Sequence, residues 1–288
     1  MLERYMEYVR EKTPLIHTIT NAVTINDVAN MLFACGARPL MSDDPVDIEE
    51  ITAFTDGLVL NLGMLNPHKL EGMFLAGEKA RELGHSIVLD PVGVGVSTFR
   101  LHAAREIMER VRPDAVRGNL SEIRMLITGE KGKNGVDADV SDGITEQNKE
   151  CVAEFVMQAA RKLGCIVCAT GAIDFVSDGL RCFAIYNGLE MMRRVTGTGC
   201  QLSAMVAAHL ASCPEEQLEA AAAAVCLLGA AGEVAREAMK LQDGNATYRN
   251  RIIDAVCCMT PDQLKAREKI EIIENMKEKR GIQDEREQ

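Results

Sequence analysis

The chain has 288 residues, enough for a substantial hydrophobic core in one large domain or two smaller ones. Hydrophobic residues make up 47% of it but aromatic residues only 4%, with no tryptophan, so the core must be aliphatic and rich in alanine and methionine. The formal net charge is −11 and no dense stripe of lysine and arginine is present, which argues against nucleic acid or an anionic membrane as a partner.

The ten cysteines and the N-terminal residues indicate the cellular compartment. Most of the cysteines lie in apolar segments, and the charged, amphipathic N-terminus lacks the apolar core of a secretory signal, so we expect reduced thiols in a cytoplasmic protein. Cys165 and Cys168 have C-x-x-C spacing, but an apolar strand points these positions to opposite faces, which disfavours zinc or redox use. The apolar runs are too short or too interrupted to predict a membrane span.

Predicted helices and strands alternate along the chain. The predicted strands cover residues 14–21, 36–41, 57–63, 86–90, 114–117 and 165–170, with a hairpin over 174–186. The predicted helices cover residues 1–12, 46–54, 67–83, 99–111, 148–163, 215–240 and 249–258, with others capped by Asn21, following residues 118–122, following residues 195–200, and beginning at Pro261. This alternation predicts an α/β fold with a largely parallel sheet in a three-layer sandwich.

The domain organisation follows from the absence of breaks in this pattern. No linker, composition shift or short repeat divides it, so we expect a single domain over residues 1–275 and a charged tail over 276–288. Residues 129–147 are rich in glycine, aspartate and lysine, which predicts a surface excursion.

Polar residues gather where the predicted strands end. Because ligands of parallel α/β sheets bind at the carboxyl ends of the strands, so many polar ends in register predict one cleft. These ends are Thr20–Asn21, Met41–Ser42, Asn61, Asp90, Arg117–Asn119, Thr170 and Gly197–Cys200.

The stretch Val195-Thr-Gly-Thr-Gly-Cys200 is the most distinctive part of the sequence. Gly197 and Gly199 permit backbone conformations in which successive N–H groups converge, and a helix that begins here adds unpaired donors and the positive end of its dipole. With Thr198, they predict an anion hole for a phosphate or a developing oxyanion. Cys200 falls in the first helical turn, where we expect a lowered thiol pKa. It is either a base or positioning group for an attacking hydroxyl, or a small buried helix cysteine.

Three further charged residues are candidates for a phosphate site. Glu122, three residues after Asn119, can hold Mg2+ against nucleotide phosphates, or the pair can be a helix cap. Asp90 precedes a glycine-rich turn and belongs either to the metal–phosphate region or to the turn itself. Arg117 ends an apolar strand, where its charge needs a partner such as a phosphate or Glu122. The five scattered histidines predict no metal cluster.

Six segments, in this order, resemble the hydroxyethylthiazole kinases of the ribokinase-like superfamily. They are residues 14–21, 36–41, 57–63, 90–95, 117–122 and 195–200. Cys200, where most ribokinase-like kinases carry aspartate, is the form seen in these kinases. The resemblance implies a ribokinase-like α/β/α sandwich and ATP-dependent phosphorylation of the hydroxyethyl group of 4-methyl-5-(2-hydroxyethyl)thiazole in thiamine salvage. It also implies Mg2+ and a homotrimer with active sites between neighbouring subunits.

The resemblance also implies functions for individual residues, position by position. Those for the thiazole are Met41, Gly197 and Asn21; those for ATP are Arg117, Thr170 and Asn119; those for the metal are Glu122 and Asp90; and those for catalysis are Cys200, Gly197, Thr198 and Gly199. One departure from the family pattern is the segment Gly244-Asn-Ala-Thr-Tyr248, which bears on nucleotide contacts.

Two rival hypotheses are weighed against this one. The first is a kinase for another small alcohol, such as hydroxymethylpyrimidine or a sugar, which Cys200 in place of aspartate disfavours. The second is a trimeric thiazole- or nucleotide-binding protein without turnover. The joint presence of Gly197–Gly199, Glu122 and Asp90 disfavours it.

Overall fold

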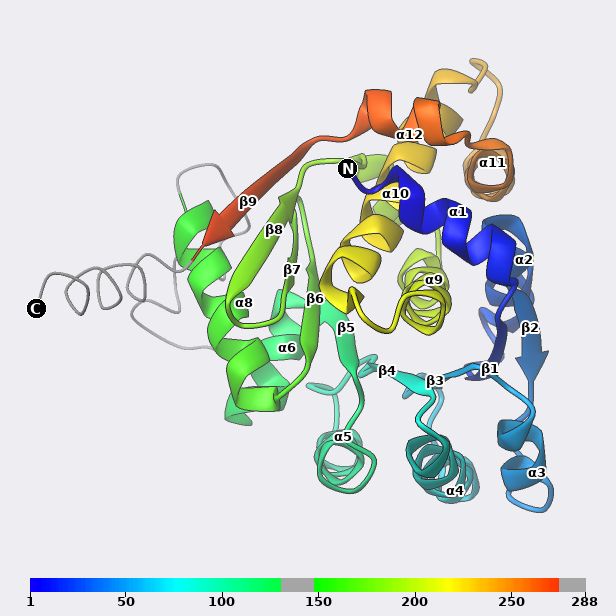
Figure 1. Ribbon diagram of the computed structural model, residues 1–288, viewed down its shortest axis with the longest axis vertical. Helices are drawn as coiled ribbons and strands as arrows, with labels where there is room; N and C mark the ends of the chain where they lie inside the picture. Colours follow the sequence, from blue (N-terminus) through cyan, green and yellow to red (C-terminus); the bar gives the residue numbers. More distant parts are fainter. Residues whose placement is uncertain (131–147, 275–288) are drawn as a thin grey trace, which may run out of the picture.

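The computed structural model describes residues 1–130 and 148–274, which form an α/β/α sandwich around one sheet (Figure 1). The strand order is β2-β1-β3-β4-β5-β6-β7-β8-β9. Pairing is parallel from β2 to β6 and antiparallel from β6 to β9, which confirms the predicted largely parallel sheet. The strands are β1 (Leu15–Ile19), β2 (Arg38–Met41), β3 (Gly57–Asn61), β4 (Ser86–Asp90), β5 (Ala115–Asn119), β6 (Ile166–Thr170), β7 (Asp174–Ser177), β8 (Arg181–Ile185) and β9 (Ile270–Glu274).

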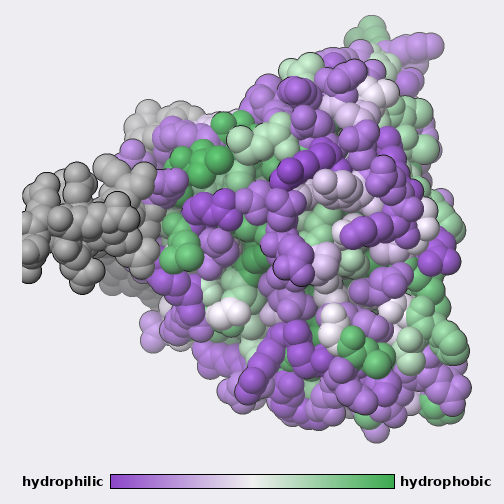
Figure 2. All heavy atoms as spheres, viewed as in Figure 1, coloured by the Kyte–Doolittle hydropathy of each residue, from purple (hydrophilic) through white to green (hydrophobic). Residues whose placement is uncertain are grey.

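Helices cover both faces of the sheet, each layer with its own apolar core. One layer contains α1 (Glu3–Lys12), α2 (Ile25–Cys35), α9 (Thr198–Ser212), α10 (Gln217–Glu237), α11 (Asn245–Cys258) and α12 (Pro261–Arg267). The other contains α3 (Ile48–Ala53), α4 (Pro67–Leu83), α5 (Thr98–Arg110), α6 (Leu120–Thr128) and α8 (Lys149–Leu163). The face of the molecule in Figure 2 is mostly hydrophilic, and apolar side chains show along the edge that carries α2 and α3 and also on the side of β8 and β9.

Local sequence signals account for the best-predicted elements. Strands β3 and β4 are buried at every position, as their continuous apolar sequences require in a sheet covered on both faces. Helix α4 begins and ends as predicted. Asn66 accepts a hydrogen bond from the Lys69 N–H, Pro67 is the first helical residue, and Gly84 ends the helix in a left-handed conformation (φ +74°).

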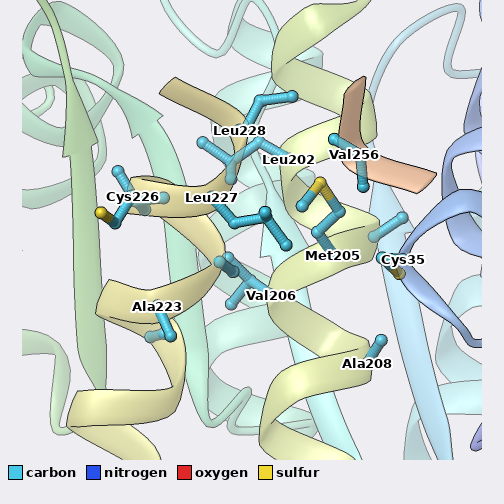
Figure 3. Packing of buried hydrophobic residues seen from close by; sticks show 14 of the residues in the cluster. Cys35, Leu202, Met205, Val206, Ala208, Ala223, Cys226, Leu227, Leu228 and Val256 are labelled. Atoms are coloured by element: carbon cyan, nitrogen blue, oxygen red, sulfur yellow. The ribbon is translucent and has the colours of Figure 1, made fainter. Parts of the chain in front are cut away.

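Helix α10 is buried in the core, although its length and composition would allow it to cross a membrane. Of its apolar window, 89% is buried inside the molecule. By length and composition this helix departs from the prediction that the apolar runs are too short or too interrupted to span a membrane, but its apolar surface faces protein. Figure 3 shows Leu202, Met205 and Val206 of α9 close to Leu227 and Leu228 of α10.

Other boundaries differ from the prediction. The helix that begins at Pro261 ends at Arg267, and Ile270–Glu274 then pairs with β8, because Ile270 and Ile273 pack against the two cores on opposite faces of the sheet. Helix α11 begins four residues earlier than predicted, after Gly244. Helix α2 begins at Ile25, so Asn21 does not cap it as predicted. The charged tail 276–288 and most of the predicted excursion, residues 131–147, lie outside the described residues.

Candidate active site

The turn before α9 requires both of its glycines. Gly197 is the N-cap of α9, with φ of +89°, and a β carbon there would lie 2.6 Å from Cγ2 of Thr24. A β carbon on Gly199 would lie 2.3 Å from Nη1 of Arg117. No side chain in the described part of the chain caps α9, so its first N–H groups remain available. The turn therefore brings free N–H donors, the positive end of a helix dipole and a guanidinium together, as an anion site requires.

Arg117, the middle residue of β5 although the predicted strand ended there, makes contacts on two sides. Its Nη2 donates a hydrogen bond of 2.8 Å to Oγ1 of Thr170, and its Nη1 lies 3.8 Å from Oδ1 of Asp90. Glu122, the partner considered from the sequence, forms no ion pair with it among the residues that the structure describes. The guanidinium is thus placed between β4, β6 and the first turn of α9.

Asp90 is fully buried at the end of β4. Its Oδ2 accepts hydrogen bonds of 2.8 Å from Nδ2 of Asn61 and from Oγ of Ser203. Its Oδ1 has no hydrogen-bond donor within residues 1–130 and 148–274. Burial raises the pKa of Asp90 to about 6, against the opposing effect of the positive charge of Arg117.

Cys200 lies in the first turn of α9, where its side chain contacts two amides. Its Sγ accepts hydrogen bonds from Nδ2 of Asn61 at 3.2 Å and from Nδ2 of Asn21 at 3.6 Å. Burial, followed by the nearby charge of Asp90, raises the pKa of the Cys200 thiol. The prediction of a lowered pKa was wrong, because loss of solvation outweighs the favourable end of the helix.

Asn21 and Asn61 meet at the topological switch point of the sheet, where the strand order reverses on the two sides of β1. Strand β1 lies between β2 and β3, and such a switch point opens a crevice at the carboxyl ends of the strands. Asn21 follows β1, Asn61 ends β3, and Nδ2 of Asn21 donates to Oδ1 of Asn61 at 3.1 Å. The sequence marks Asn61 only as a polar strand end, and its contacts with Asp90 and Cys200 were not predicted.

Asn119 and Glu122 form a capping box at the start of α6, which is the cap considered from the sequence. Oδ1 of Asn119 accepts from the Glu122 N–H at 2.9 Å, and Oε2 of Glu122 accepts from the Asn119 N–H at 2.9 Å. Oε1 of Glu122 accepts from the Gly93 N–H at 2.9 Å, so this carboxylate also fixes the turn after β4. The negative charge of Glu122 contributes to the raised pKa of Asp90.

A cavity of about 660 Å³ opens beside the turn. Its polar side carries the predicted residues Arg117, Asn119, Thr170, Thr198 and Gly199. The rest of its wall was not predicted and contains Leu120, Ser121, Gly171, Ala172, Asp174, residues 187–190, Met192, Arg193, Leu202, Val225, Leu228 and Gly229. The cavity thus has a polar end at the carboxyl ends of β5 and β6 and an apolar wall on α9 and α10, in the size range of small-molecule sites.

Met41 and Lys69 lie outside this cavity. Met41 ends β2, and its Sδ accepts a hydrogen bond from Oγ1 of Thr18 on β1. Lys69, which the sequence analysis missed, is 4% exposed, and its Nζ donates to the backbone oxygen of Thr20, directly before Asn21. Burial lowers the pKa of Lys69, while Asp43 and Cys200 favour its charged form. No signal in the sequence marks this lysine, since it occupies an ordinary position in the first turn of α4.

Comparison with solved structures identifies the fold. The pyridoxal kinase from Staphylococcus aureus covers 91% of this chain with a TM-score of 0.60 at 15% identity, and a ribokinase-like superfamily protein from Enterococcus faecalis covers 92% with the same TM-score at 13% identity. The matched part is 98% and 93% of those chains, respectively. The fold is therefore that of the ribokinase-like proteins, as the sequence resemblance implied.

Closer relatives give the family. The model of the hydroxyethylthiazole kinase family matches residues 6–262. The chain is 44% identical to the hydroxyethylthiazole kinase of Clostridium acetobutylicum, over 92% of this chain and 97% of that protein, and 41% identical to that of Ruminiclostridium cellulolyticum, over 90% and 92%. The solved hydroxyethylthiazole kinase from Pyrococcus horikoshii has a TM-score of 0.84 at 35% identity, covering 95% of this chain and 99% of that one. The chain belongs to the hydroxyethylthiazole kinase family.

Proposed function

We propose that the chain transfers the γ-phosphoryl group of ATP to the hydroxyethyl group of 4-methyl-5-(2-hydroxyethyl)thiazole, as thiamine salvage requires. One observation carries this proposal beyond family membership. Thr198 and Gly199 of the turn line the 660 Å³ cavity, whereas Cys200, the next residue, does not line it and contacts Asn21 and Asn61. A phosphoryl donor on one side of the turn and an alcohol on the other would meet at the N-terminus of α9.

The nucleotide would occupy the cavity. Leu202, Val225 and Leu228 offer its base an apolar surface, and Arg117, Thr170 and Asn119 lie at the polar end, where the phosphates would lie. The guanidinium can pair with phosphate oxygens, and the free N–H groups of Thr198 and Gly199 can stabilise the charge that develops on the transferred group.

Mg2+ fits the acidic residues of this site. Among the described residues no group of three or more histidine, cysteine or acidic side chains could hold a metal by itself. Mg2+ bound to a nucleotide needs only one or two carboxylates together with the phosphates. Asp90 offers a buried Oδ1 that lacks a hydrogen-bond donor, and Glu122 has a carboxylate close enough to affect it. When bound, Mg2+ would neutralise charge on the transferred phosphate.

The acceptor alcohol would lie on the other side of the turn, near Asn21, Met41 and Gly197. Its oxygen would attack the γ-phosphorus as the bond to the β-phosphate oxygen breaks, so that ADP leaves and the hydroxyl proton passes to a phosphate oxygen or to water. Because burial raises the pKa of Cys200, this thiol is mostly protonated at neutral pH and is suited to orienting the alcohol. A loose transition state asks little of a base, so the backbone of Gly197–Gly199 and Arg117 would contribute more than the thiol.

Assembly would complete the acceptor side. We propose a homotrimer in the cytoplasm, with active sites between subunits and one kinase domain over residues 1–275 in each. Exposed apolar side chains support such an interface: Val23 is 66% exposed, Ile25 41% and Phe33 63%, all on or directly before α2 and close in sequence to Asn21. Apolar side chains also show along the edge that contains α2 in Figure 2.

Release of ADP with three alcohols tests this function. Mg2+-ATP would be supplied with hydroxyethylthiazole, hydroxymethylpyrimidine or ribose, and each mixture assayed for ADP. Turnover with the thiazole alone supports the proposal. Turnover with one of the other alcohols alone would replace the substrate, and thiazole binding without ADP release would indicate a binding protein.

A further inference from the structure

Asn61 is a fully buried residue that uses both ends of its side-chain amide. Its Oδ1 accepts hydrogen bonds from the Gly63 N–H at 2.9 Å and from Nδ2 of Asn21 at 3.1 Å. Its Nδ2 donates to Oδ2 of Asp90 at 2.8 Å and to Sγ of Cys200 at 3.2 Å. One amide therefore contacts both the carboxylate and the thiol of the candidate site.

The chemistry of these neighbours fixes the orientation of the amide. A backbone N–H can only donate, so the Asn61 atom that faces Gly63 must be the oxygen. The nitrogen then faces Asp90 and Cys200, both of which can accept. The reverse orientation would place an oxygen against the Asp90 carboxylate and an N–H against the Gly63 N–H, and both contacts would be repulsive.

The surrounding backbone holds Asn61 in place. The parallel register of β3 and β4 pairs Asn61 directly with Asp90. Gly63 leaves space for the amides, since a β carbon there would lie 2.8 Å from Nδ2 of Asn21 and 2.9 Å from Oδ1 of Asn61. The amide thus has a specified position as well as a specified orientation.

On the basis of the proposed kinase function, we infer that Asn61 is a positioning residue that links the acceptor end of the site to its phosphate end. Because the sulfur of Cys200 accepts N–H groups from Asn61 and Asn21, its own proton must point away from both amides. Asn61 and Ser203 both donate hydrogen bonds to Oδ2 of Asp90. The other carboxylate oxygen, Oδ1, therefore faces Nη1 of Arg117 at 3.8 Å.

The pH dependence of Cys200 alkylation tests the contact with the thiol without any substrate. Iodoacetamide labelling would be followed by peptide mass spectrometry in the full chain and in Asn61→Ala and Asn61→Asp. Loss of the N–H donor disfavours the thiolate, and the introduced carboxyl disfavours it further, so the pH of half-maximal reactivity should rise, by about one unit or more in Asn61→Asp. Exposed Cys151, in the same digest, should not shift. An unchanged midpoint for Cys200 in both variants would overturn the inference.

A third variant keeps the test possible if the Asn61 variants do not fold. Gly63→Ala leaves Asn61 intact but places a methyl group against its amide oxygen, so it should raise the same midpoint. If the Asn61 variants do not fold and Gly63→Ala leaves the midpoint unchanged, the inference is wrong.

A double-mutant cycle tests the link to catalysis. Asn61→Ala should lower kcat by about tenfold or more and leave the KM for ATP nearly unchanged, and the loss should be smaller in a Cys200→Ala background. Losses that multiply in full would show that Asn61 does not act through Cys200. If the unmodified chain does not phosphorylate the thiazole, the proposed function fails. The alkylation midpoints would still show whether Asn61 contacts and orients the thiol of Cys200.

Discussion

Nη2 of Arg117 donates a hydrogen bond of 2.8 Å to Oγ1 of Thr170, although the two residues lie 53 positions apart. The parallel pairing of β5 and β6 brings both strands to the same end of the sheet, where Asn119 is opposite Thr170. Thr170 thereby holds a guanidinium whose other end faces Asp90 and Gly199. The placement of this single positive charge connects the sheet to the anion site.

Removing the Thr170 hydroxyl should weaken nucleotide binding more than it slows the chemical step. Thr170→Val keeps the shape of the side chain but removes the acceptor for Arg117, a charge-assisted hydrogen bond worth about 1.5–3 kcal/mol. We expect the KM for ATP to rise by about tenfold with kcat nearly unchanged. Steady-state kinetics with varied ATP checks this, and an unaltered KM for ATP would contradict it.

A methyl group on Gly199 should disable the site without unfolding the protein. Its β carbon would lie 2.3 Å from Nη1 of Arg117, a flexible side chain that can move away from the turn. Gly199→Ala should therefore lower kcat by about a hundredfold, in line with the loss of a preorganised charge-stabilising group. Gly84→Ala, at the C-terminus of α4, is the control, since a β carbon there has no atom within 4 Å and the strain of its positive φ bears on stability and not on the site. Equal activities of the two variants would contradict the anion-site assignment.

Glu122→Gln separates the cap of α6 from metal binding. Glutamine can still serve in a capping box, so the free energy of unfolding should fall by no more than about 1 kcal/mol. The loss of negative charge beside Asp90 should raise the Mg2+ concentration required for half-maximal activity several-fold. Thermal melting and Mg2+ titrations measure the two effects. A large fall in stability with an unchanged Mg2+ requirement would limit Glu122 to the helix cap.

The buried carboxyls should give stability and activity opposite dependences on pH. Burial raises the pKa of Asp90 from 3.8 to about 6 and that of Asp174 from 3.8 to about 7. Between the ordinary and raised values only the folded chain holds these protons, so their contribution to stability is present at low pH and is lost as pH rises through about 6 and 7. Catalysis that requires ionised Asp90 should instead decline as pH falls.

Melting curves without nucleotide test the stability half of this expectation. The unmodified chain should gain stability relative to Asp90→Asn as pH falls from about 8 to about 5, because the variant lacks this carboxyl. A stability difference that stays constant over that range would contradict a raised pKa for Asp90.

Periodicity and helix caps predicted most of the fold. The apolar strand Gly57–Asn61 and the helix Pro67–Leu83 carry their own signals, and the structure places both close to the expected positions. The edge strand Ile270–Glu274 was not predicted, because its pairing with β8 depends on a surface that only the assembled sheet provides. The sequence after Pro261 predicted a helix because local signals carry no information about pairing with β8.

The candidate site was predictable where residues follow strand ends. Arg117, Asp90 and Cys200 lie near one another, but of the three only Arg117 lines the cavity, so the single cleft stays a prediction. The direction of the Cys200 pKa shift was not predictable, because it depends on burial and on a neighbour 110 positions earlier in the sequence, Asp90. Lys69 was not predicted either, because its burial and its contact with Thr20 exist only in the folded chain.

Direct detection of the phosphorylated thiazole tests whether the chain phosphorylates the hydroxyethylthiazole. Mass spectrometry would measure its formation from Mg2+-ATP by the unmodified chain, Cys200→Ala and Gly199→Ala. We expect product from the unmodified chain, less from Cys200→Ala, and the least from Gly199→Ala. Product from Gly199→Ala at the rate of the unmodified chain, or no phosphorylated thiazole from any of the three, would contradict it.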